Sequence, residues 1–261
     1  MGSRKQPHRT TADAGQIGGK RILVTGASSG IGAATADLLS SEGATVGVHY
    51  YRKKAEAQKL IEKIRAAGGR AEGFEADLLS RDARSRLVPE AIERLGGLDG
   101  LVNNAGVVIG PAPFLELDEA AWSQTFLLNV ESPFFLSKEA FRHMQEAGGG
   151  KIVNISSVGV KYGGSPHTLH YSAAKAALEG VTLGLAKAGA PHRVLVNAIR
   201  PGVIETPFHT IKSRQEWEAR VQQIPLKRPG TPLDVARMVL FLLSPAGDFI
   251  TGQIFAVSGG E

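Results

Sequence analysis

Short apolar segments alternate with longer segments of helical periodicity along nearly the whole sequence, and this alternation restricts the possible folds more than any other feature. The short segments are β-branched or leucine-rich, and they are Arg21–Thr25, Ala44–His49, Ala71–Glu75, Leu98–Val102, Lys151–Ile155, Val194–Ala198 and Gln253–Val257. The helical segments between them are Ile31–Glu42, Lys53–Ala67, Arg81–Leu95, Glu119–Ala147, Tyr171–Ala188 and Pro232–Leu243. Strand and helix alternation predicts an α/β fold with a doubly wound, seven-stranded, mainly parallel sheet flanked by helices.

The length of 261 residues suffices for one sizeable core, and α/β domains of this size commonly remain undivided. We therefore expect one domain over residues 18–261, preceded by a flexible basic tail over residues 1–17. The regular order is interrupted at Glu205–Leu226, a segment rich in charged residues with no clear strand. This segment predicts a small helical lid over the substrate.

The charge and the cysteine count exclude several classes of function. The net charge is +5, but Arg4, Lys5, Arg9 and Lys20 against Asp13 place +3 of it in the first twenty residues. A short basic segment of this kind is typical of a solvated tail, so we expect no nucleic-acid partner. It contains no apolar run, so we expect neither a signal peptide nor a transmembrane span. The absence of cysteine excludes disulfides and thiolate metal sites and favours the cytoplasm.

A glycine-rich turn, Thr25–Gly32, follows the first predicted strand and opens the first predicted helix. Glycine lets the backbone turn sharply and approach a pyrophosphate, and the helix N-terminus offers unpaired N–H groups. The glycine spacing differs from G-x-G-x-x-G and from the P-loop, so the turn alone leaves a simple tight turn as an alternative. The candidate dinucleotide contacts in it are Gly26, Ser28, Ser29, Gly30, Ile31 and Gly32.

Tyr171 and Lys175 lie four residues apart at the start of a predicted helix, so their side chains share one face. The lysine charge would favour the tyrosine phenolate and lower its pKa, as acid–base catalysis requires. An ordinary surface pair is the alternative. Ser157 follows the strand Lys151–Ile155 at the same sheet edge, where its hydroxyl would hold a substrate oxygen, and Ser156 is its rival for that role.

These motifs, in this order, resemble those of the short-chain dehydrogenase/reductase family over nearly everything after the tail. The family's T-G-x-x-x-G-x-G corresponds to Thr25–Gly32, and its Tyr-x-x-x-Lys to Tyr171–Lys175. The other corresponding positions are Asp77-Leu78 for its adenine contact, Asn103–Gly106 for Asn-Asn-Ala-Gly, Ser157 for its strand-end serine, Asn129 for its catalytic asparagine, and Pro201-Gly202 with Thr206 for its Pro-Gly motif. Ile224–Gly230 and Ile250–Gln253 are similar to bacterial 3-oxoacyl-carrier-protein reductases.

The resemblance implies a Rossmann-type fold, hydride transfer between a nicotinamide cofactor and a small-molecule carbonyl or alcohol substrate, and often a homotetramer. It assigns catalysis to Asn129, Ser157, Tyr171 and Lys175, with Tyr171 as the general acid or base and Asn129 positioning a water. Lys175 would also hold the ribose hydroxyls. The resemblance also implies further candidate cofactor contacts, which are Asp77, Leu78, Asn104, Ala105, Gly106, Tyr171, Lys175, Pro201, Gly202, Val203, Ile204 and Thr206.

The end of the second predicted strand favours NADP(H) over NAD(H). An NAD enzyme places Asp or Glu about twenty residues beyond the glycine turn to bind the ribose hydroxyls. This sequence has none there, and the residues at this place are His49, Tyr50, Tyr51, Arg52 and Lys53. Arginine holds a 2′-phosphate through charge-assisted hydrogen bonds, much as in the similar His-Tyr-x-Arg stretch of pteridine reductases. The alternative is that these are the solvated first residues of the next helix.

Several other interpretations stay open. An NAD(H)-dependent alcohol or sugar dehydrogenase of the same family is one, and a non-catalytic nucleotide sensor is another. Asn129 lies within a predicted helix, where a polar core position or a kink near Pro133 would also explain it. His167 and His170 either face the substrate or are solvated loop residues, and the seven histidines show no metal-ligand spacing, so we expect no metal.

Aromatic residues recur at near-helical spacing in the segment Glu119–Ala147. Trp122, Phe126, Phe134, Phe135 and Phe141 are the residues concerned. This spacing predicts core or subunit packing rather than a cofactor site.

Overall fold

The computed structural model describes residues 17–206 and 214–261, and it confirms the predicted α/β architecture. Seven strands form one sheet in the order β3-β2-β1-β4-β5-β6-β7, and every neighbouring pair is parallel. The strands are β1 (Arg21–Val24), β2 (Thr45–Tyr50), β3 (Arg70–Glu75), β4 (Gly100–Asn103), β5 (Gly150–Ile155), β6 (Val194–Pro201) and β7 (Ile254–Val257). The chain reverses its direction of winding between β1 and β4, which opens a crevice at the carboxyl ends of these strands.

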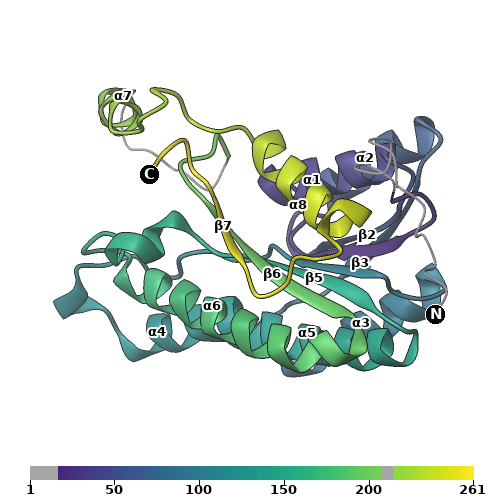
Figure 1. Cartoon of the computed structure of the whole chain (residues 1–261). Helices are drawn as coiled ribbons and strands as arrows, with labels where there is room; N and C mark the ends of the chain where they lie inside the picture. Colours follow the sequence, from purple (N-terminus) through teal and green to yellow (C-terminus); the bar gives the residue numbers. More distant parts are fainter. Residues whose placement is uncertain (1–16, 207–213) are drawn as a thin grey trace, which may run out of the picture.

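Helices cover both faces of the sheet (Figure 1). One layer holds α1 (Gly30–Ser41), α2 (Lys54–Ala66) and α8 (Pro232–Leu243), and the other holds α3 (Arg81–Leu95), α4 (Glu119–Phe126), α5 (Ser132–Glu146) and α6 (Leu169–Gly189). Short 3₁₀ turns are η2 (Phe114–Glu116), η4 (Val158–Tyr162), η5 (Ala190–His192) and η6 (Pro245–Gly247). No helix among the described residues is long and apolar enough to cross a membrane.

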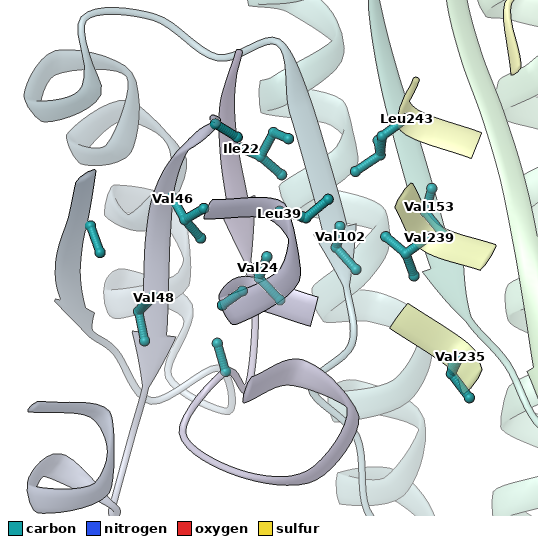
Figure 2. Packing of buried hydrophobic residues seen from close by; sticks show 14 of the residues in the cluster. Ile22, Val24, Leu39, Val46, Val48, Val102, Val153, Val235, Val239 and Leu243 are labelled. Atoms are coloured by element: carbon teal, nitrogen blue, oxygen red, sulfur yellow. The ribbon is translucent and has the colours of Figure 1, made fainter. Parts of the chain in front are cut away.

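Two apolar cores hold these layers to the sheet. On one face, β-branched side chains such as Ile22, Val24 and Val46 pack against Leu39 of α1 and Val239 of α8 (Figure 2). The other face packs against α3, α5 and α6. Because both faces are covered, the strands read as nearly continuous apolar runs rather than as alternating patterns.

The last residue of the predicted N-terminal tail, Ile17, is part of the apolar core. Ile17 is 1% exposed and belongs to the core against α1, so the domain begins there rather than at residue 18. Its backbone carbonyl accepts a hydrogen bond from Lys20. Burial of a whole isoleucine side chain stabilises this position, whereas the remainder of the predicted tail lies outside the described residues.

The predicted helix Glu119–Ala147 is divided by a π-helical turn at Leu127–Glu131. Pro133 has no N–H to donate to the carbonyl of Asn129, which removes one bond of the regular helical ladder. The hydroxyl of Ser132 also donates to the carbonyl of Leu127, at 2.9 Å. The irregularity predicted near Pro133 therefore takes the form of a π turn that includes Asn129.

The C-terminal part of the predicted lid is helical, as α7 (Arg214–Gln222). In Figure 1, α7 lies beyond the end of the sheet, close to the C-terminal end of the chain. The segment 207–213 of this predicted lid lies outside the described residues.

Candidate active site

A cavity of about 650 Å³ opens at the carboxyl ends of the strands, where the sequence places its motifs. This volume is typical of a small-molecule or cofactor site. The cavity brings together most of the predicted site residues: Gly26, Ser28, Ser29, Gly30, Ile31, His49, Tyr50, Tyr51, Arg52, Lys53, Asp77, Leu78, Asn104, Ala105, Gly106, Ser157, Tyr171, Lys175, Pro201, Gly202, Ile204 and Thr206. Gly32, Asn129 and Val203 do not line it, and all three are buried.

The glycine-rich turn requires glycine at two positions for different reasons. Gly26 has φ +63°, and a Cβ there would lie 2.9 Å from the Cα of Ala105. A Cβ on Gly32 would lie 2.4 Å from the carbonyl oxygen of Gly26, although Gly32 itself has ordinary helical geometry. The turn is held from β4 by Asn104, whose Nδ2 donates to the carbonyl of Thr25 at 2.8 Å.

His49 borders the cavity, but both of its ring nitrogens are engaged by the protein. Nδ1 accepts a hydrogen bond from the N–H of Gly26 at 2.9 Å, and Nε2 donates to the carbonyl of Ala76 at 3.1 Å. The side chain is 2% exposed, and burial lowers the pKa of His49 to about 4. The neutral ring therefore ties the glycine-rich turn to the end of β3.

The residues after β2 present positive charge to the same end of the cavity. The guanidinium of Arg52 lies 5.2 Å from the ring centroid of Tyr51, which is a stacked cation–π arrangement. Lys53 Nζ donates to Ser29 Oγ at 3.3 Å, so the glycine-rich turn and the start of α2 meet here. After the neighbouring strand β3, Asp77 uses one carboxylate oxygen to accept from the N–H of Leu79 at 3.0 Å.

The two candidate serines have different surroundings. Ser156 is 3% exposed and its hydroxyl donates to Oε1 of Glu179 at 2.6 Å, so it is committed to an internal network. Ser157 is half-buried, and its Oγ accepts from the N–H of Gly159 at 3.1 Å. That contact leaves the Ser157 O–H as a donor for another oxygen.

Tyr171 and Lys175 lie on one face of α6, which begins at Leu169 rather than at Tyr171. Lys175 Nζ lies 5.6 Å from the ring centroid of Tyr171 and donates to the carbonyl of Ile155 at 2.8 Å. The predicted lowering of the Tyr171 pKa is not found, because burial raises the pKa of its hydroxyl above the ordinary value. Burial also lowers the pKa of Lys175, to about 7.

Asn129 is fully buried in the π turn, directly behind this pair. Its Nδ2 donates to the carbonyls of Val107 and Thr125, at 3.0 and 2.9 Å. Its Oδ1 and Lys175 Nζ both lie against Gly106, where an added Cβ would come within 2.5 Å and 3.0 Å of them. Within the described residues Oδ1 has no protein donor, which suits a bound water.

Sequence and structure comparisons agree on the family. The family described as Enoyl-(Acyl carrier protein) reductase matches residues 26–261. The chain is 40% identical to the 3-oxoacyl-[acyl-carrier-protein] reductase of Aquifex aeolicus, over 94% of this chain and 98% of that protein. It belongs to the short-chain dehydrogenase/reductase family. It is therefore an oxidoreductase that transfers a hydride between a nicotinamide cofactor and a carbonyl or secondary alcohol.

Solved structures of short-chain dehydrogenases have the same fold. A short-chain dehydrogenase from Burkholderia cenocepacia in complex with NADP has a TM-score of 0.88 and 34% identity, covering 94% of this chain and 98% of that one. A 7α-hydroxysteroid dehydrogenase complexed with NADH and 7-oxoglycochenodeoxycholic acid has a TM-score of 0.90 and 34% identity, covering 97% and 98%. Both nicotinamide dinucleotides thus occur among its structural relatives.

The residues of this short-chain dehydrogenase/reductase fit such a dinucleotide. The turn at Gly26 and Gly30 leaves space that side chains would fill, and Ser29 at the N-terminus of α1 makes no side-chain cap there. The turn and the N-terminus of α1 thus border the same cavity as Arg52, Lys53 and Tyr171, and the N–H groups of Gly26 and Ala27 are bonded to His49. This is the arrangement that a helix N-terminus offers to a pyrophosphate.

Sequence reasoning missed the apolar side of the cavity. The residues not predicted are Ala76, Leu79, Val107, Ile109, Gln124, Leu128 and Ile155. Ala76 and Ile155 could have been found, because each lies at the carboxyl end of a predicted strand. The side chains from the loop after β4 and from α4 carry no motif, and only the tertiary structure places them here.

Both interpretations of His170 were wrong, because this residue neither lines the cavity nor faces solvent. It is fully buried at the start of α6, and its Nε2 donates to the carbonyl of Ile109 at 2.9 Å. The carbonyl can only accept, which fixes the proton on Nε2. His170 therefore holds the loop that forms the apolar side of the cavity.

Proposed function

We propose that this protein is an NADP(H)-dependent carbonyl reductase or alcohol dehydrogenase, similar to 3-oxoacyl-carrier-protein reductases, in which Ser157, Tyr171, Lys175 and Asn129 form the catalytic group. The observation that carries the proposal is one cavity with a polar, positively charged end at Arg52 and an acid–base group at Tyr171. In the reduction, the carbonyl carbon gains a hydride and its oxygen gains a proton, while NADPH becomes NADP⁺.

A bound nicotinamide supplies the hydride, and the side chains manage the substrate oxygen and its proton. The Ser157 O–H donates to the carbonyl oxygen and holds it near Tyr171. The raised pKa of Tyr171 keeps its hydroxyl protonated at neutral pH, which is the form that donates in a reduction. Lys175, whose pKa is about 7, then returns a proton to Tyr171, and Asn129 holds the water that connects Lys175 to solvent.

Replacement of Tyr171 by phenylalanine tests the mechanism. Because it removes the proton donor and keeps the ring, we expect kcat to fall by on the order of 10²–10⁴ while NADPH binding persists. Initial rates with a panel of ketones and aldehydes, followed through NADPH absorbance, measure the first quantity, and fluorescence titration measures the second. Near-normal turnover of any ketone by Tyr171→Phe would contradict the assignment.

The preference for NADP(H) rests on the positive end of the cavity. Residues 50–53 contain no carboxylate to bind the ribose hydroxyls, and Arg52 is stacked on Tyr51 beside Lys53. Charge-assisted hydrogen bonds contribute roughly 1.5–3 kcal/mol, so Arg52→Ala is expected to weaken NADPH binding by about 10- to 100-fold and NADH binding little. Titrations of both cofactors, with the exposed Lys59→Ala as control, check this. Tighter binding of NADH than of NADPH by the wild type would refute the preference.

We also propose a homotetramer, because the described surface has two separate apolar faces. Phe134, Phe135 and Leu183 lie half-exposed on α5 and α6. Phe241 of α8 and Phe249, which is fully exposed, lie towards the other face of the sheet and its free edge strand β7. Exposed apolar patches of this kind mark interaction sites, and two self-complementary interfaces close a tetramer of twofold symmetry.

Three further expectations from the sequence remain proposals. Residues 18–261, together with the core residue Ile17, form one catalytic domain. The segment 205–226 acts as a lid over the substrate. The cysteine-free sequence suits a reducing compartment, and we place the protein in the cytoplasm.

A further inference from the structure

The substrate end of the cavity has an apolar wall built from two segments. Val107 and Ile109 come from the loop after β4, while Gln124 and Leu128 come from α4 and the following π turn. Gln124 and Leu128 are four residues apart, so they lie on the same side of their helix. The wall is apolar except for one neutral amide.

This wall is held in place by three buried donors rather than left to loop mobility. Asn129 Nδ2 donates to the carbonyl of Val107 at 3.0 Å. His170 Nε2 and Thr125 Oγ1 both contact the carbonyl of Ile109, at 2.9 and 3.5 Å. All three donor residues are fully buried. Because the backbone of this loop is fixed from behind, the shape of the wall is fixed before a substrate binds.

Of the charged side chains that line the cavity, Lys175 is the one placed beside this wall, since its Nζ lies against Gly106, the residue before Val107. Among the residues that the structure describes, the charged ones that line the cavity are Arg52, Lys53, Asp77 and Lys175. The first three follow β2 and β3 at the cofactor end, and Lys175 Nζ already donates to the carbonyl of Ile155. Among the residues that the structure describes, Val107, Ile109 and Leu128 offer a carboxylate or phosphate no ion-pair partner, so an anion placed against them would lose its hydration without that compensation.

We infer that the substrate is an uncharged carbonyl compound, or its secondary alcohol, whose apolar carbon skeleton packs against Val107, Ile109 and Leu128. A neutral hydrogen-bonding group, such as an ester, amide or hydroxyl, faces Gln124, whose amide both donates and accepts. Small oxo acids and sugar phosphates with an anion within a few bonds of the carbonyl are therefore excluded. This inference rests on the proposed reaction and adds the chemical class of its substrate.

Matched pairs of esters and acids provide the test. The first pair is methyl 4-oxopentanoate with 4-oxopentanoate, and the second is methyl 4-oxocyclohexanecarboxylate with the free acid. The wild type is expected to prefer the ester in kcat/KM by at least about 100-fold, since the acid must bury an unpaired charge. Acid and ester turnover within about threefold of each other would overturn the substrate class and leave the proposed reaction intact. If the protein oxidises NADPH with none of these esters and acids, the proposed reaction is overturned, and the inference with it.

Two variants locate the selectivity at the wall. Ile109→Arg supplies a positive charge that can pair with the acid, so we expect the ratio of kcat/KM for the ester to kcat/KM for the acid to fall at least tenfold. The uncharged control Ile109→Met should keep the wild-type value of this ratio. Gln124→Leu should lower kcat/KM for methyl 4-oxocyclohexanecarboxylate about fivefold relative to 4-methylcyclohexanone, because only the ester loses a hydrogen bond. If Ile109→Arg and Ile109→Met have the same ratio, the wall does not determine the class.

Discussion

The buried ring of His49 links the stability of the fold to pH. Burial lowers its pKa to about 4, against about 6.5 in the unfolded chain. As pH falls from 6.5 towards 4, the unfolded chain therefore binds a proton that the folded chain does not, and the free energy of unfolding decreases, by about 3 kcal/mol at the limit. A proton on Nδ1 would also remove the acceptor for the Gly26 N–H.

The control for this prediction is His49→Gln, which keeps a donor and an acceptor but does not titrate. Urea unfolding between pH 7 and pH 4.5 should show a shallower loss of stability for this variant than for the wild type. Parallel pH dependences of the two proteins would show that His49 does not carry the effect.

At the scale of elements, the entry into α1 depends on the absence of a side chain at Gly32. A Cβ there would lie 2.4 Å from the Gly26 carbonyl, so Gly32→Ala must displace the turn or the helix. We expect a loss of roughly 1–3 kcal/mol in stability and at least tenfold weaker NADPH binding. Gly18→Ala is the matched control, since an added Cβ there meets nothing within 4 Å. Thermal unfolding and cofactor titration measure both effects, and a Gly32→Ala protein with wild-type cofactor affinity would contradict this account of the turn.

At the scale of the whole molecule, the two apolar faces predict a stepwise assembly. Phe135→Asp places a charge on the face of α5, and Phe249→Asp places one beside β7. Each change is expected to convert a tetramer into a dimer, and the double variant into a monomer, because a buried unpaired charge opposes association. Light scattering at micromolar concentration measures the mass, and Leu115→Asp, at an 85% exposed residue outside both faces, should leave it unchanged. A wild type that is monomeric under these conditions would rule out the proposal.

The sequence by itself determined the strand and helix order and the positions of the motifs, because periodicity, glycine turns and strand ends are local properties. The glycine-rich turn, Tyr171 and Lys175 are such local motifs, and the structure brings Gly26, residues 28–31, Tyr171 and Lys175 to one cavity. Only the tertiary structure shows that Ser156 is bonded to Glu179, since Glu179 lies 23 residues from Ser156 in the chain.

The contrast between local patterns and long-range contacts also explains the other differences between the sequence predictions and the structure. The π turn around Asn129, the raised pKa of Tyr171 and the burial of His170 all result from segments that meet only after folding. The apolar wall of Val107, Ile109 and Leu128 has no local signature, because any buried loop or helix contains such residues. Local patterns thus predicted which residues meet at the cavity, whereas long-range packing determined their burial and the shape of the cavity.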